Sequence, residues 1–139
     1  MPVETTFAMV KSKAVNSSLL GRVMDRILIS GFTIIRAQQA WMTPVQINTL
    51  YFPHAEKPYY QDLVDSVGHG VVIMALAREG AIGYWRDIMG ATNPKEATPN
   101  TIRHWARTEK RMADNIVHGS ANVIDAKWEL RLFFPGVVF

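Results

Sequence analysis

The stretch Gly70-Val71-Val72-Ile73-Met74-Ala75-Leu76-Ala77 decides the fold class of this chain. A strand with one solvated face alternates apolar and polar residues, whereas this stretch shows no such alternation. It therefore predicts a central strand that is covered on both faces. The elements around it must supply that cover.

Two further strands and a helix are predicted on the N-terminal side. Residues 5–11 form an apolar run that Lys11 closes, and residues 32–41 begin with β-branched and aromatic residues. Between them, apolar residues recur with helical spacing over residues 20–28, and Gly31 ends that helix.

The same signals divide the rest of the chain. Tyr51 lies at the far end of a helix that begins at Thr43, and Tyr59 lies on the polar face of the next helix, which opens at Lys57-Pro58. After the central strand we expect a helix over residues 80–89, a loop over residues 90–100 and a short strand that ends at His118. A last helix is expected over residues 121–134, with Ile124, Trp128 and Leu132 packed inward.

This order mixes strands and helices without requiring parallel pairing. It predicts an α+β sandwich with helices on a mainly antiparallel sheet, as a single domain over residues 1–139.

The composition is that of a globular domain, since 48% of the 139 residues are apolar and 19% are charged. No apolar run approaches the ~20 residues that span a bilayer, so we expect no membrane partner. The absence of cysteine excludes disulfides and thiol chemistry, and it fits a cytoplasmic protein. The formal net charge of +3 allows a phosphate-bearing ligand or a nucleic acid.

Several familiar catalytic motifs are missing. The four histidines lack HExxH spacing, and the chain contains no GxxxxGK(S/T) loop, GxGxxG element or GxSxG turn. What remains is a set of cations at element ends or beside the long loop, namely Lys11, Arg86 and Arg103. If these converge, they suit a ligand with several negative charges, such as a polyphosphate.

His118 ends the apolar run of the stretch Asn115-Ile116-Val117-His118-Gly119-Ser120. A lone histidine in such a place is more often a buried, hydrogen-bonded side chain than a nucleophile. Its meaning depends on the residues that accompany it.

Landmarks along the chain occur in one recognisable order and spacing. They are Thr6-Phe7-Ala8-Met9-Val10-Lys11, Gly31-Phe32, Tyr51, Lys57-Pro58-Tyr59-Tyr60, Arg86, Met89-Gly90-Ala91-Thr92-Asn93-Pro94, Thr101-Ile102-Arg103, the stretch around His118, Glu129 and Phe133-Phe134-Pro135. From Thr6 to Pro135 the chain therefore resembles the nucleoside diphosphate kinase family, and the blocks around Thr92 and His118 are the most specific.

The resemblance implies a ping-pong phosphoryl transfer from a nucleoside triphosphate, typically ATP, to a nucleoside diphosphate. It implies that His118 attacks the γ-phosphate through Nδ1 and becomes a phosphohistidine. Glu129 then bonds the other ring nitrogen, and Ser120 steadies Glu129.

The resemblance also implies the nucleotide contacts. They are Lys11, Arg86, Thr92 and Arg103 on the phosphates, Lys11 and Asn115 on the ribose, Tyr51 near His118, Tyr59 stacked on the base and Met112 over the other face of the base. Mg²⁺ is implied as a cofactor that the nucleotide phosphates carry, with no protein ligands. The implied fold is a ferredoxin-like βαββαβ sandwich, assembled as a homo-oligomer (a hexamer or a tetramer of dimers).

The chain departs from the family pattern in two main places. Lys11 is followed by Ser12-Lys13-Ala14 where the family has Pro-Asp-Gly, so a negative charge has become positive. His104-Trp105-Ala106 stands in place of Gly-Asp-Phe, with a short insertion before Asn115. The cations of residues 104–114 either enlarge the positive field over the phosphates or solvate a surface segment, and the second is the commoner behaviour of charge runs.

Two alternative functions remain open. A divergent member could act as a nucleotide-binding regulatory scaffold with little turnover, although the intact set of site residues argues against this. The positive charge could instead serve a nucleic acid, but the chain lacks a basic stripe with interleaved aromatic residues.

Overall fold

The computed structural model describes residues 2–139, which form a four-stranded sheet with strand order β2-β3-β1-β4. The strands are β1 (Val3–Val10), β2 (Thr33–Ala40), β3 (Val71–Glu79) and β4 (Val117–Gly119). Every pairing is antiparallel: β1 pairs with β3 and β4, and β2 pairs with β3. The predicted α+β fold with an antiparallel sheet is confirmed.

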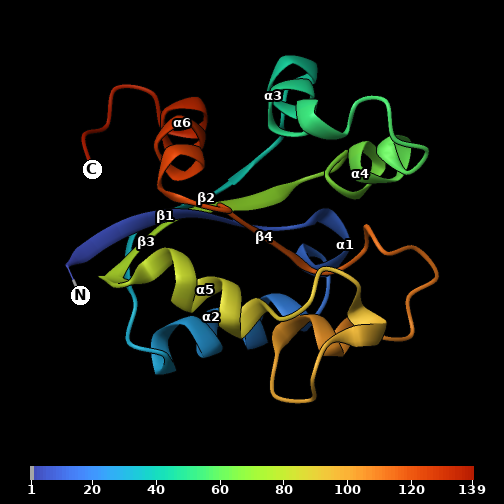
Figure 1. Cartoon of the computed structure of the whole chain (residues 1–139), viewed down its shortest axis with the longest axis horizontal. Helices are drawn as coiled ribbons and strands as arrows, with labels where there is room; N and C mark the ends of the chain where they lie inside the picture. The colour runs from blue at the N-terminus through green and yellow to red at the C-terminus, as the bar shows by residue number, and fades with distance from the viewer. Residues whose placement is uncertain (1) are drawn as a thin grey trace.

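Helices cover both faces of the sheet, as Figure 1 shows. Below the sheet in that view lie α2 (Leu19–Ile29) and α5 (Ala81–Met89), and above it lie α3 (Pro44–Leu50), α4 (Tyr60–Ser66) and α6 (Val123–Phe133). The short segments are α1 (Ser12–Val15), η1 (Phe52–His54), η2 (Pro94–Glu96) and η3 (Ile102–Ala106).

The central strand β3 contributes to two separate cores, one on each face. Val71 and Ile73 pack in the cluster that includes residues of α3 and α6, whereas Met74 and Leu76 pack in the cluster that includes residues of α2 and α5. Because both faces of β3 are covered, its sequence does not alternate, as predicted.

Three local predictions are corrected by the structure. Lys11 lies just beyond β1, at the start of the unpredicted helix α1. Tyr59 directly precedes α4, without a side-chain capping bond, and does not lie on the polar face of that helix. Ile124 is 76% exposed, because α6 buries the stripe formed by Ala126, Leu130 and Phe133 instead.

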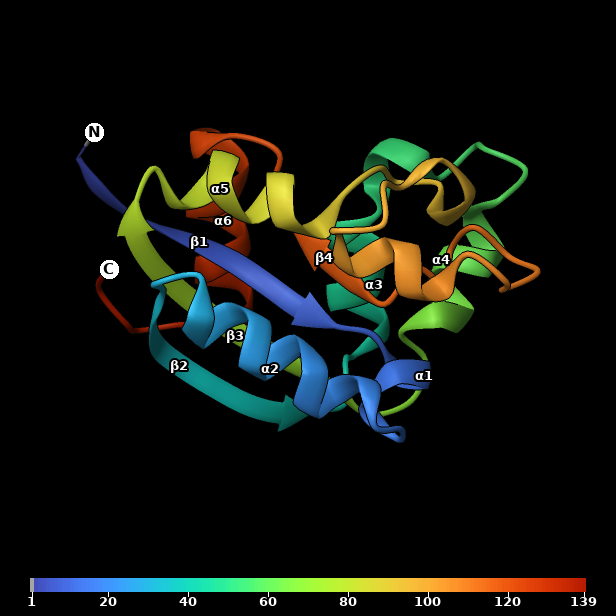
Figure 2. The ribbon, with the colours of Figure 1, turned by 90° about the horizontal axis from the view of Figure 1, so that it is seen from below.

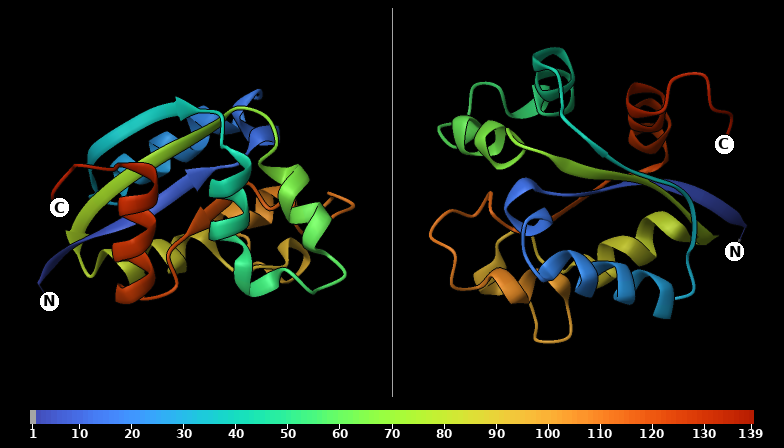
Figure 3. Two further views of the ribbon diagram at one scale, coloured as in Figure 1. Left: turned by 90° about the horizontal axis from the view of Figure 1, so that it is seen from above. Right: turned by 180° about the vertical axis from the view of Figure 1, so that it is seen from behind.

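The functional elements gather at one end of the molecule. Figures 2 and 3 show β4, α4 and the loop after α5 together at the end of the sheet where β1 finishes, opposite both chain ends. Within residues 2–139, no helix has both the length and the apolar character needed to cross a membrane.

Candidate active site

A cavity of about 420 Å³ opens at this gathered end of the sheet. Nine of the ten predicted site residues line it: Lys11, Tyr51, Tyr59, Arg86, Thr92, Arg103, Asn115, His118 and Glu129. The tenth, Ser120, is fully buried beside the cavity and reaches it through Glu129. Residues that lie far apart in the sequence are thus brought to one place.

The orientation of the His118 ring is set by a buried carboxylate. Nε2 of His118 lies 2.9 Å from Oε1 of Glu129, and the Ser120 hydroxyl donates to the same oxygen at 3.2 Å. Glu129 is only 3% exposed. An ionised carboxylate only accepts hydrogen bonds, so Nε2 carries the proton and the lone pair of a neutral ring lies on Nδ1. None of the described residues makes a hydrogen bond to Nδ1.

The backbone around His118 is held by close packing against α5. The indole nitrogen of Trp85 donates to the carbonyl of His118 at 3.3 Å. A Cβ atom on Gly119 would lie 2.4 Å from the Trp85 ring, so only glycine permits this approach. The rings of Tyr51 and Phe7 flank the imidazole, with centroids 6.2 and 5.8 Å from it.

The turn that precedes His118 is strained. Ile116 has φ +75°, which is rare for a β-branched residue. The amide of Val117 donates to the carbonyl of Asn115 at 2.9 Å, which closes a γ-turn, and the amide of Lys11 donates to the carbonyl of Ile116 at 2.8 Å. A conformation that costs on the order of 1–3 kcal/mol therefore brings Asn115 and His118 into the same cavity.

Two buried basic side chains, those of Lys11 and Arg103, line the cavity wall. The Lys11 ammonium donates to the carbonyl of Ala113 at 2.9 Å, and burial, with the neighbouring charge of Arg103, lowers the Lys11 pKa to about 7. Arg103 donates to the carbonyls of Gly90 and Val117 at 3.1 and 3.0 Å, and burial lowers its pKa to about 10. An anionic ligand would favour the charged forms of both side chains.

Three buried polar atoms in this cavity lack a hydrogen-bond partner. They are the Tyr51 hydroxyl, Nε of Arg103 and Oδ1 of Asn115, and the described chain has no other buried side-chain atom of this kind. Buried polar atoms in proteins almost always have partners, so these groups are suited to a polar ligand that enters the cavity. Burial raises the pKa of Tyr51, so its hydroxyl stays protonated and can donate.

The other predicted contacts lie at the rim. Arg86 donates to the carbonyl of Ala121 at 2.8 Å, and the carbonyl of Thr92 accepts from the Asn115 amide at 2.8 Å. Met112 also lines the cavity and is 41% exposed.

Sequence reasoning missed two supporting residues of this site. Nδ1 of His54 lies 2.7 Å from the Tyr59 hydroxyl and so fixes that ring. The bond from Trp85 to the His118 carbonyl depends on a contact between distant segments, which no local pattern reveals.

An ion pair connects the two departures from the family pattern. Lys13 forms an ion pair with Glu109, which lies in the divergent segment before Asn115. Ser12 is buried, accepts from the amide of His69 at 3.1 Å and donates to its carbonyl at 2.9 Å. The positive charge at position 13 therefore pairs with a residue of the altered segment.

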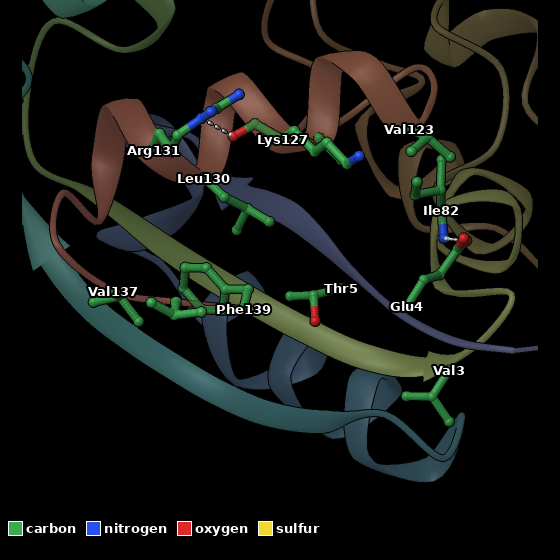
Figure 4. A pocket seen from close by; sticks show the side chains of 12 residues that line it. Val3, Glu4, Thr5, Ile82, Val123, Lys127, Leu130, Arg131, Val137 and Phe139 are labelled. Carbon is green, nitrogen blue, oxygen red and sulfur yellow. Dashed lines mark hydrogen bonds between the residues drawn. The ribbon is translucent and has the colours of Figure 1, made fainter.

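A second cavity, of about 490 Å³, lies at the opposite end between β1, α6 and the C-terminal residues (Figure 4). Its lining is mainly apolar, and its Glu4 carboxylate already accepts the amide of Ile82 at 2.9 Å. It contains none of the predicted site residues and none of the unpartnered buried atoms. The smaller cavity at His118 is therefore the candidate active site.

Comparisons with known proteins relate almost the whole chain to one family. The family model described as nucleoside diphosphate kinase matches residues 4–138. The nucleoside diphosphate kinase of Moorella thermoacetica is 38% identical over 135 residues, which is 96% of this chain and 96% of that protein. The enzyme of Geobacter sulfurreducens is 35% identical over 95% of this chain and 96% of its own length.

Solved structures show the same relationship. The nucleoside diphosphate kinase of Aquifex aeolicus superposes with a TM-score of 0.86 at 32% identity, covering 97% of each chain. The halophilic enzyme of Halobacterium salinarum, solved in complex with CDP, superposes with a TM-score of 0.89 at 27% identity, covering 99% of this chain and 93% of that one.

Proposed function

Because the chain belongs to the nucleoside diphosphate kinase family and is a phosphotransferase of that kind, we propose that His118 is the residue that receives the phosphoryl group. The observation that carries the proposal is the hydrogen bonding of the two ring nitrogens of His118. Glu129 holds Nε2 at 2.9 Å, whereas Nδ1 has no partner among the described residues and the ring lines the cavity. The family matches support an enzyme over a regulatory scaffold.

In the first half-reaction, the Nδ1 lone pair attacks the γ-phosphorus of a nucleoside triphosphate. A bond forms between Nδ1 and phosphorus, the bond to the β,γ-bridging oxygen breaks, and the nucleoside diphosphate leaves with that electron pair. The ring gains positive charge and keeps its proton on Nε2, where the Glu129 carboxylate stabilises it. In the second half-reaction, a terminal oxygen of another nucleoside diphosphate attacks the phosphorus and releases His118.

The phosphates are held by the cations of the cavity. Arg103 has an unpartnered Nε, and Lys11 is buried with a lowered pKa, so each gains a favourable interaction when an anion enters. Arg86 and Thr92 complete the set from the rim. In phosphoryl transfer, such positioning and charge stabilisation supply most of the catalysis.

The contacts to the nucleoside do not distinguish one base from another. Oδ1 of Asn115 is buried and unpartnered, and with Lys11 it is assigned to the ribose hydroxyls. The Tyr59 ring stacks on the base, and stacking accepts every base because each has a π-face. Met112 covers the other face, so we expect broad nucleotide specificity. The CDP in the Halobacterium salinarum structure supports a nucleoside diphosphate as ligand here.

Kinases of this family generally use a divalent metal ion. Residues 2–139 contain no group of three or more His, Cys, Asp or Glu side chains that could hold one. A cavity with buried cations suits a metal ion that arrives on the phosphates, where it neutralises part of their charge. We therefore propose Mg²⁺ bound by the nucleotide rather than by the protein.

The proposal extends to a cytoplasmic homo-oligomer built from dimers, a hexamer or a tetramer, with residues 1–139 of each copy forming one domain. Support comes from β2, whose outer edge pairs with no strand of the described chain. Leu28, Ile29 and Trp41, before and after this strand, are 60%, 75% and 68% exposed. An open strand edge beside exposed apolar side chains is a usual site of self-association. Sedimentation of the purified protein tests it, and a monomer at micromolar concentration would contradict it.

The experiment that tests the central proposal uses γ-labelled ATP. The purified protein should acquire an acid-labile, base-stable label that added GDP discharges. His118→Ala should acquire none. Absence of label on the wild-type protein, or label that persists in His118→Ala, would contradict the proposed nucleophile.

A further inference from the structure

Arg111 connects two parts of the chain that lie on different walls of the nucleotide cavity. Its Nε and one terminal nitrogen donate to the Asp114 carboxylate at 3.1 and 3.3 Å. Its other terminal nitrogen lies 3.5 Å from Asp62 and 3.4 Å from Asp65, both on α4. The guanidinium therefore bridges the divergent segment before Asn115 to α4, the helix that follows Tyr59.

The residues on either side of this bridge face the cavity. Tyr59, Asp62 and Leu63 line it from the α4 side, and Met112 and Ala113 line it from the other side. The Ala113 carbonyl also accepts from the buried Lys11 ammonium at 2.9 Å. A shift of Met112 would thus move one wall of the cavity, while the bond from Lys11 holds Ala113 in place.

The charge of Arg111 is not available to phosphate. Three carboxylates surround it, so its donors are occupied and its field is balanced locally. This distinguishes it from Arg103, which keeps a free buried Nε. A role in widening the positive field over the phosphates is therefore excluded for Arg111.

We propose that Arg111 is a positioning residue that sets the width of the base slot by tying Met112 to the α4 wall. The inference rests on the proposed function, in which the base enters between Tyr59 and Met112. Without the bridge, the segment samples wider positions, and apparent affinity falls with the populated fraction of the narrow one. Exposed ion pairs are individually weak, so the effect is moderate.

The test compares a ligand that has a base, ADP, with one that lacks it, ribose 5-diphosphate. In Arg111→Met, calorimetry should show the Kd for ADP raised roughly three- to tenfold, and the Kd for ribose 5-diphosphate unchanged. The single-turnover rate of His118 phosphorylation at saturating ATP should also stay unchanged. Arg111→Lys, which retains a charge for Asp62 or Asp65, should recover most of the ADP affinity.

Arg107→Met is the matched control, because Arg107 donates only within its own segment, to the carbonyl of His104 at 3.1 Å. It should bind both ligands as the wild type does. An unchanged Kd for ADP in Arg111→Met, or an equal loss for both ligands, would overturn the inference. Failure of the wild-type protein to bind ADP or to acquire label would instead overturn the proposed function, so the two failures are distinguishable.

Discussion

Replacing Glu129 by glutamine preserves the size of the side chain and removes its charge. The carboxylate is buried and lies 2.9 Å from Nε2 of His118. When the ring becomes positive, opposite charges about 4 Å apart attract by roughly 4 kcal/mol at an effective dielectric constant of 20. Glutamine retains a neutral hydrogen bond that is about half as strong as a charge-assisted one. We therefore expect the transition state to lose about 2–3 kcal/mol, which slows phosphorylation roughly 30- to 150-fold.

The assay is rapid-quench measurement of phosphohistidine formation from γ-labelled ATP under single-turnover conditions. Circular dichroism melting checks that Glu129→Gln folds as the wild type does. Ser120→Ala, which loses the 3.2 Å bond to Glu129 and a longer bond, at 3.5 Å, to the carbonyl of Phe7, should slow the step roughly five- to tenfold. A folded Glu129→Gln protein that phosphorylates at the wild-type rate would refute the claim that Glu129 stabilises the charged ring.

Further predictions concern Lys11, Gly119 and Tyr59. The pKa of Lys11 is about 7, so this side chain is mostly neutral at pH 8 in the free protein. Nucleotide binding at pH 8 should therefore be accompanied by uptake of a proton. Calorimetry in different buffers should show this uptake as a buffer-dependent heat of binding, and Lys11→Met should abolish it. Burial lowers the pKa of Lys11 from its ordinary value of 10.5 to about 7, so the unfolded chain binds more protons than the folded chain between these two pH values. The ligand-free protein should accordingly gain stability from pH 7 to 10 relative to Lys11→Met in urea titrations. Gly119→Ala should slow phosphorylation more than about tenfold, because the added methyl group clashes with Trp85 and shifts His118; a normal rate would contradict the packing argument. Tyr59→Ala should raise KM for ATP and CTP alike by roughly five- to 100-fold, whereas Tyr59→Phe, which loses only the bond to His54, should change it little.

The sequence predicts this fold well where one physical signal dominates. The unbroken apolar run of β3 indicates a strand covered on both faces, and the predicted order of elements agrees with the structure. The helix predicted to begin at Thr43 is α3, and Thr43 and Gln46 form a capping box at its start. Prediction fails where tertiary contacts decide, as for Ile124, because the whole stripe of α6 is set by how that helix sits on the sheet.

The candidate site shows the same division. Family motifs identify the residue types, and the cavity brings them together, but the strained φ of Ile116 and the unpartnered Oδ1 of Asn115 have no local sequence signal. The Arg111 bridge joins residues 46–49 positions apart in sequence. Charge patterning alone suggested a solvated segment, whereas the structure shows three carboxylates around that one arginine.

The measurement that tests the central claim most directly is the identity of the phosphorylated ring nitrogen. Nitrogen-15 NMR of histidine-labelled protein after reaction with ATP distinguishes phosphate on Nδ1 from phosphate on Nε2. Because Glu129 occupies Nε2 and leaves Nδ1 free, phosphate should appear on Nδ1 of His118 alone. Phosphate on Nε2, or on another histidine, would contradict the arrangement proposed for this site.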